Sequence, residues 1–133
     1  MADYFFPELR ILVVDDSEYS RKQIIKVLTE ANLNVIGEAS SAREAIDGAA
    51  RLKANLLLVD IVMPERNGIE LTKVIMEQFQ DVYVIIVSSL AQEHIIMEAI
   101  TAGAVDFIQK PFVGQNLISS IAKVNKLLTE GDE

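Results

Sequence analysis

Three aspartates and one lysine are the residues of this sequence best suited to chemistry, because each stands just after a short apolar run. Asp15 and Asp16 follow the first run, Asp60 follows the third, and Lys110 comes shortly after the fifth. If folding brings two of these carboxylates to about 4 Å from each other, they repel by about 4 kcal/mol at an effective dielectric constant near 20. A cluster of all three therefore needs a cation.

The available ligands favour a hard metal ion. The sequence has no cysteine and a single histidine, His94, which excludes thiolate sites and sites built from several imidazoles. Carboxylates and water suit Mg²⁺, so we expect Mg²⁺, with Mn²⁺ able to substitute. Lys110 adds a positive charge and Ser88, at the end of the fourth run, adds a hydroxyl group. This combination is suited to a phosphoryl group, and we favour Ser88 over the neighbouring Ser89 by its offset from Lys110.

The elements that must position these residues alternate along the chain. Five short apolar runs predict strands at Arg10–Val14, Val35–Ala39, Leu56–Val59, Val82–Val87 and Val105–Ile108. Apolar residues at helical spacing between and after them predict helices at Glu18–Ala31, Ala42–Leu52, Ile69–Phe79, Gln92–Ala102 and Gln115–Thr129. Ser41 and Glu44 form a capping-box pattern, and Gly103 stands where a helix end is expected.

This alternation predicts an α/β fold in which a five-stranded parallel sheet lies between two layers of helices, a three-layer sandwich. The third and fourth strands are apolar on both faces, as expected when helices cover both sides of a sheet. Ligands of such sheets bind beyond the carboxyl ends of the strands, where the polar residues stand. We expect one domain over residues 1–133, with its core from about 9 to 128.

Composition restricts the class of protein. The chain has 133 residues, with 12 Lys and Arg against 20 Asp and Glu, a formal charge of −8. An acidic chain repels phosphate backbones, so we expect no direct nucleic-acid binding. The start of the chain has no basic segment, and no apolar run approaches the roughly 20 residues that span a bilayer. Together with the missing cysteines, this predicts a cytoplasmic protein without membrane insertion.

Several motifs carry a resemblance to a known family. They are the pair Asp15-Asp16, the segment Asp60-Ile61-Val62-Met63-Pro64 followed by Gly68, the residues Ser88 and Phe107, and the segment Lys110-Pro111-Phe112. In this order, each near a strand end, they resemble the receiver domain of two-component response regulators from about Leu9 to Leu128. The resemblance implies a flavodoxin-like fold with strand order 2-1-3-4-5. It also implies a cis peptide bond before Pro111.

The resemblance further implies a role for each site residue. Asp60 is the phosphoacceptor, and Lys110 and Ser88 assist at the phosphoryl group. The ligands of Mg²⁺ are Asp15, Asp16, Asp60 and the backbone carbonyl of Val62. Ser88 and Phe107 form the switch that responds to phosphorylation. The implied partners are a histidine kinase or phosphotransfer protein and a downstream protein that binds the face made by the fourth helix, fifth strand and fifth helix.

Two positions depart from the family in a way that affects chemistry. Val62 and Leu90 are apolar, and in this family these side chains flank the path of the hydrolytic water. We expect them to exclude water and to lengthen the lifetime of the phosphoryl group. On the fourth helix, Met97 is expected on a binding surface, whereas Ile100 is expected on the buried face.

Other interpretations are weighed against a stand-alone receiver. The chain could be a receiver excised from a longer methylesterase or transcription factor, and we favour the stand-alone form. A Mg²⁺-dependent phosphatase of related topology is the rival from another class. Such enzymes usually carry a second aspartate two residues after the nucleophile, where this chain has Val62, so we expect no turnover enzyme. His94 is expected to be a solvated surface residue.

Overall fold

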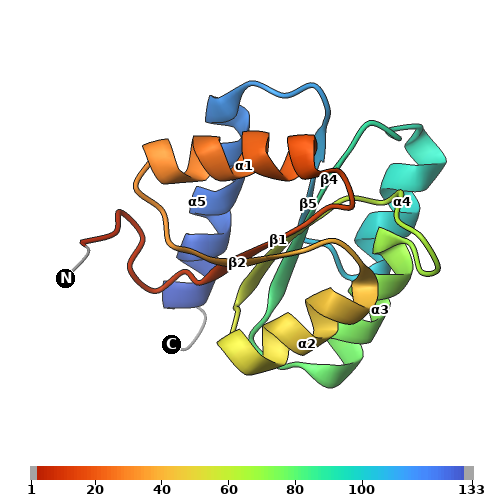
Figure 1. Cartoon of the computed structure of the whole chain (residues 1–133), viewed down its shortest axis with the longest axis horizontal. Helices are drawn as coiled ribbons and strands as arrows, with labels where there is room; N and C mark the ends of the chain where they lie inside the picture. Colours follow the sequence, from red (N-terminus) through yellow and green to blue (C-terminus); the bar gives the residue numbers. More distant parts are fainter. Residues whose placement is uncertain (1–2, 131–133) are drawn as a thin grey trace.

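Strands and helices alternate in the computed structural model, which describes residues 3–130 of the chain (Figure 1). The strands in this part are β1 (Ile11–Val14), β2 (Val35–Ala39), β3 (Leu56–Val59), β4 (Tyr83–Ser88) and β5 (Asp106–Gln109). The helices are α1 (Glu18–Glu30), α2 (Ala42–Leu52), α3 (Gly68–Gln78), α4 (Glu93–Ala102) and α5 (Gly114–Glu130). Every predicted element is present, with its ends within one residue of the prediction. The ends of the expected domain, residues 1 and 133, lie outside the described residues.

All strand pairs are parallel, and the order across the sheet is β2-β1-β3-β4-β5, which confirms the predicted α/β fold. Helices α1 and α5 cover one face of the sheet, and α2, α3 and α4 cover the other (Figure 1). The central strands are in register at their carboxyl ends, with Val14 opposite Val59 and Val59 opposite Ile86. The residues that follow β1 and β3 are therefore neighbours at one edge of the sheet.

Alternate residues of each central strand enter two separate apolar layers. In β1, Leu12 and Val14 pack toward α2, α3 and α4, whereas Ile11 and Val13 pack toward α1 and α5. Every residue of β1 and β3 is buried. Burying a side chain of this size contributes about 1.5–3 kcal/mol, so the two strands that hold the acidic residues belong to the most firmly packed part of the fold.

Helix ends show where local sequence patterns succeed and where they fail. Ser41 caps α2 by accepting a hydrogen bond from the Glu44 backbone N–H at 3.2 Å, as predicted. The Glu44 carboxylate, however, accepts from Ser40 rather than from Ser41, so the predicted capping box is only half formed. A complete box begins α3 instead, between Asn67 and Glu70. Asn67 Oδ1 accepts from the backbone N–H groups of Ile69 and Glu70, both at 2.9 Å, and the sequence pattern Asn67-x-x-Glu70 signals this box.

Gly103 ends α4 with φ of 121°, which supports the predicted helix end. A Cβ atom at this position would also lie 2.4 Å from Cγ of Met76. Glycine is therefore required at position 103 both by backbone conformation and by the close approach of α3.

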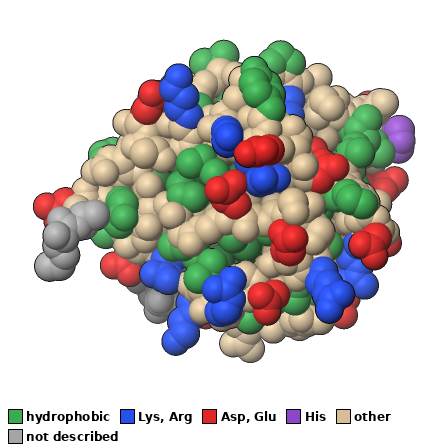
Figure 2. Space-filling model, viewed as in Figure 1, with side chains coloured by type: hydrophobic (Ala, Val, Ile, Leu, Met, Phe, Trp, Pro, Cys, Tyr) green, Lys and Arg blue, Asp and Glu red, His purple; other side chains and the backbone are tan. Residues whose placement is uncertain are grey.

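The surface carries both signs of charge. Figure 2 shows Lys and Arg side chains interspersed with Asp and Glu side chains over the visible face, without a continuous basic stretch. His94 is exposed on α4, as expected. Met97 is 62% exposed, and its place on a binding surface stays a prediction. Ile100 is 46% exposed, so the prediction of a buried Ile100 is wrong; Ala99 is the buried residue of α4. Within residues 3–130, none of the helices is long and apolar enough to cross a membrane.

Candidate functional site

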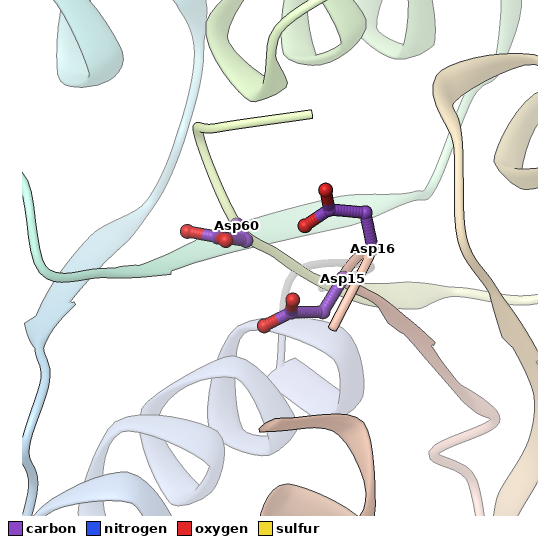
Figure 3. Close-up of side chains that lie close together, drawn as sticks. All are labelled: Asp15, Asp16 and Asp60. Atoms are coloured by element: carbon purple, nitrogen blue, oxygen red, sulfur yellow. The ribbon is translucent and has the colours of Figure 1, made fainter. Parts of the chain in front are cut away.

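Three carboxyl groups meet at the carboxyl edge of the sheet. Asp15 directly follows β1, Asp16 comes next, and Asp60 directly follows β3. Each of the three aspartates offers an oxygen within 4.8 Å of the others. In Figure 3 the three carboxyl groups lie close together. The parallel register of β1 and β3 thus brings together residues that lie 45 positions apart in the sequence.

Backbone N–H groups hold two of these aspartates in place. The Asp60 backbone N–H donates to the carbonyl of Val14 at 2.9 Å, and Asp60 Oδ1 accepts from the Ile61 N–H at 2.8 Å. Asp15 is buried, and its Oδ1 accepts from the Ser17 N–H at 2.9 Å. Asp16 is exposed. Two carboxylates are therefore fixed by the fold, and the third faces solvent.

Lys110 enters the cluster from the segment after β5. Its Nζ lies 2.7 Å from Asp15 Oδ2 and 3.7 Å from Asp60 Oδ2. Its backbone N–H donates to the carbonyl of Ser88 at 2.9 Å, and the bond between Lys110 and Pro111 is cis, as the resemblance implied. The predicted meeting of the three aspartates with this lysine is therefore present.

The charges of the cluster do not balance. The cluster holds three carboxylates, and the one ammonium group that pairs with it, Lys110, contacts Asp15 and Asp60, which leaves an excess of two negative charges. Burial raises the pKa of Asp60, and the nearby Asp15 carboxylate raises it further, although Lys110, the Ile61 N–H and the Ser88 hydroxyl act in the opposite direction. An excess of two negative charges on oxygen ligands fits a hard divalent cation such as Mg²⁺.

The other predicted site residues lie on β4, on β5 and in the segment after Asp60. Ser88 is the last residue of β4 and is fully buried, and its Oγ accepts from the Leu90 N–H at 3.1 Å. Ser89 is exposed and does not cap α4, whose N-cap is Gln92 without a side-chain hydrogen bond. Phe107 lies in β5, half-buried against the apolar layer of α2, α3 and α4. The Val62 side chain is 55% exposed.

Helix α1 adds two contacts to the cluster that the sequence interpretation missed. Ser20 Oγ lies 2.8 Å from Lys110 Nζ. Arg21 donates from Nη1 to the backbone carbonyl of Asp15 at 2.7 Å and pairs through Nε with Glu38 of β2 at 2.9 Å. Ser20 precedes the buried Ile24 by four residues, so helical spacing alone places it on the inward side of α1.

Gly68 is a further residue whose role only the structure reveals. It begins α3, and its N–H donates to the carbonyl of Ile61 at 2.9 Å. A Cβ atom on Gly68 would lie 2.1 Å from the carbonyl oxygen of Asp60, which is a severe overlap with backbone. Glycine at this position lets α3 approach the segment that carries Asp60.

Comparison with known proteins agrees with this geometry. The family model described as response regulator receiver domain matches residues 11–122. The chain belongs to this family. A chemotaxis protein CheY from Thermotoga maritima is 39% identical over 117 residues, covering 88% of this chain and 98% of the relative. A protein-glutamate methylesterase from Archaeoglobus fulgidus is 40% identical over 117 residues, but these cover only 33% of that longer protein.

Solved structures give the same assignment. The response regulator domain of Thermotoga maritima CheB has a TM-score of 0.78 at 36% identity, covering 91% of this chain and 96% of that one. The CheX-CheY-BeF3-Mg²⁺ complex from Borrelia burgdorferi gives a TM-score of 0.83 at 29% identity, covering 87% and 88%. Receiver domains are signalling modules that bind Mg²⁺ at an aspartate cluster and interact with histidine kinases and downstream targets. The family therefore supports the receiver interpretation over the phosphatase.

Proposed function

We propose that this receiver domain accepts a phosphoryl group on Asp60. The observation that carries the proposal is the juxtaposition of Asp60 with two further carboxylates and with the Lys110 ammonium group at one edge of the sheet. Phosphoryl transfer depends mainly on positioning and on charge stabilisation, and it needs no strong general base when the nucleophile is already ionised.

In the proposed step, a carboxylate oxygen of Asp60 attacks the phosphorus atom of the donor. A new P–O bond forms, the bond between phosphorus and the donor's nitrogen or oxygen breaks, and the leaving group keeps the electron pair. The product is an acyl phosphate. Lys110, whose ammonium lies 3.7 Å from Asp60 Oδ2, stabilises the negative charge that gathers on the phosphoryl oxygens.

The proposed ligands of Mg²⁺ are Asp15, Asp16, Asp60 and the backbone carbonyl of Val62. The excess of two negative charges and the oxygen-only donor set support this assignment. Bound there, Mg²⁺ neutralises charge on the carboxylates and on the transferred phosphoryl group. We propose that Mn²⁺ can substitute, because it also accepts carboxylate and water ligands.

The proposed switch uses Ser88 and Phe107. An acyl phosphate adds about one negative charge to Asp60 together with strong acceptor oxygens, which attract the Ser88 hydroxyl. Movement of Ser88 changes the space beside β5, into which Phe107 turns. The expected output surface is the face of α4, β5 and α5, on which Met97 and Ile100 are already exposed.

The proposed partners are a histidine kinase or phosphotransfer protein as donor and a downstream protein on the α4, β5 and α5 face. The proposed activity is signalling without catalytic turnover of a separate substrate. We infer a single receiver domain with its core at residues 9–128. A cytoplasmic location stays a prediction from the sequence.

Phosphorylation by a small donor tests the proposal. Incubation with acetyl phosphate and Mg²⁺ is expected to add one phosphoryl group, measured by intact-protein mass spectrometry. The Asp60→Asn variant and a sample with chelator serve as controls, and both are expected to stay unmodified. A phosphoryl adduct that persists in either control would place the chemistry elsewhere. Replacement of Mg²⁺ by Mn²⁺ in the same assay tests the metal substitution.

A further inference from the structure

The Lys110 ammonium has more than one anchor. It carries three N–H bonds, and its nitrogen lies 2.7 Å from Asp15 Oδ2 and 2.8 Å from Ser20 Oγ. The Asp60 carboxylate, at 3.7 Å, is beyond hydrogen-bond distance. In this arrangement two of the three N–H bonds have acceptors, and the third is available to a group at Asp60.

The two groups that accept from Lys110, Asp15 and Ser20, differ in whether they also belong to the acidic cluster. Asp15 is a carboxylate in the acidic cluster that fits Mg²⁺, so a cation there competes with Lys110 for its oxygens. Ser20 belongs to no carboxylate cluster and carries no charge. Its oxygen stays available to the ammonium whether or not the carboxylates bind a metal. Ser20 is therefore the one of the three neighbouring groups whose contact with Lys110 does not depend on the state of the acidic cluster.

Ser20 is itself held firmly near the edge of the sheet. It lies in the first turn of α1, where its backbone N–H donates to the capping Ser17 Oγ at 3.2 Å. The next residue, Arg21, ties the same turn to the backbone carbonyl of Asp15. The buried Ile24 anchors the following turn in the core. A long lysine side chain loses much rotamer entropy when it becomes fixed. A firmly held hydroxyl restricts Lys110 before the phosphoryl group arrives, so less of this entropy is lost during the transfer.

We propose that Ser20 is a positioning residue that holds the Lys110 ammonium beside Asp60 for phosphoryl transfer. This inference rests on the proposed function, and it assigns to α1 a part in orienting a group on the segment after β5, 90 positions away in the sequence. Ser20 acts through Lys110 and does not contact the phosphoryl group.

Three substitutions in the full chain separate the hydroxyl from the shape of the side chain. Ser20→Ala removes the hydroxyl and adds no atoms, Ser20→Val removes it in a β-branched side chain, and Ser20→Thr keeps it in nearly the same shape as valine. Phosphorylation by acetyl phosphate with Mg²⁺ is expected to slow about tenfold in the Ala and Val variants, because a hydrogen bond to a charged group is lost. The Thr variant is expected to stay within about twofold of the wild type, since it retains the acceptor.

A second measurement follows the lysine directly. The two Lys110 Hε protons are expected to give separate NMR signals while the side chain is fixed, and to merge in the Ala variant. Mg²⁺ affinity, measured by calorimetry, is expected to change less than about twofold, because Ser20 is not a metal ligand. Phosphorylation of the Ser20→Ala variant at the wild-type rate would overturn the inference. Unchanged Lys110 signals in that variant would also overturn it. A wild type that takes no phosphoryl group would instead refute the proposed function, while the Lys110 signals would still report on the Ser20 anchor.

Discussion

Replacing Asp60 by Asn is expected to stabilise the metal-free protein, although it removes the proposed phosphoacceptor. Asparagine keeps an oxygen that can accept the Ile61 N–H, now bonded to Asp60 Oδ1 at 2.8 Å. It removes one of three carboxylates whose oxygens lie within 4.8 Å of each other. The Asp60 side chain is only 12% exposed, so solvent screens this repulsion incompletely.

The expected gain follows from the distances. The ligand oxygens of Asp60 and Asp15 lie no more than 4.8 Å apart, so at an effective dielectric constant near 20 their repulsion is at least about 3.5 kcal/mol. The attraction between Asp60 and Lys110, at 3.7 Å, is about 4.5 kcal/mol. These two nearly cancel, which leaves the burial of the Asp60 charge and a screened repulsion from the exposed Asp16. We expect the Asn variant to be more stable by about 1–2 kcal/mol, a rise in Tm of about 3–8 °C for a chain of this length.

Thermal unfolding in chelator tests this expectation, with Asp47→Asn as control, because Asp47 and its partner Arg51 are both exposed. The pKa of Asp60 is raised in the folded state, so its ionised form costs stability above that pKa. As the pH falls through the raised pKa, the wild type takes up a proton and recovers stability. The advantage of the Asn variant should therefore be smaller near pH 4 than near pH 7.

Saturating Mg²⁺ is expected to reverse the order of the two proteins. A ligand at about 100 times its Kd stabilises the folded state by about 2.7 kcal/mol, and the Asn variant lacks one of the proposed ligands. An Asn variant that is less stable than the wild type in chelator at pH 7 would refute the electrostatic reasoning. A gain equal to that of Asp47→Asn would also refute it.

Three further predictions concern the surroundings of Asp60. Gly68→Ala is expected to lower the free energy of unfolding by about 2–4 kcal/mol and to slow phosphorylation, because the added Cβ would lie 2.1 Å from the Asp60 carbonyl oxygen. Denaturant unfolding measures the first effect and the acetyl phosphate assay measures the second. Ser88→Ala is expected to lower the free energy of unfolding by about 1–3 kcal/mol, because the Leu90 N–H loses its acceptor. The same variant is expected to show a weaker change in the NMR shifts of β5 on phosphorylation. Unchanged β5 shifts on phosphorylation of the wild type would contradict this role of Ser88. The double variant Val62→Asn, Leu90→Glu is expected to lose its phosphoryl label faster than the wild type, and slower loss would show that these apolar side chains do not exclude water.

Local sequence determined the elements of this fold and the order of its polar strand ends. Short apolar runs such as Leu56–Val59, between longer helical segments, predict buried strands. The helical spacing of apolar residues predicts α1 to α5 to within one residue of their ends. Because parallel strands end at one edge of a sheet, the meeting of Asp15, Asp60 and Lys110 followed from their positions after these runs.

Other features depended on contacts between distant segments. Helical spacing points Ser20 inward, but its contact with Lys110 depends on how α1 packs against the segment after β5. The overlap that forbids a side chain on Gly68 depends on the path of the Asp60 backbone. The exposure of Ile100 depends on how α4 lies against its neighbours.

The sequence by itself thus determined which groups stand at the carboxyl edge of the sheet, because each follows a strand and parallel strands end at the same edge. The order of the strands came from the family resemblance. Only the tertiary structure decided how these groups are held. Distances of 2.7–3.7 Å around Lys110 arise from side-chain conformations and helix placement, which no local pattern encodes. The same packing leaves the acidic cluster with two uncompensated charges and sets the raised pKa of Asp60.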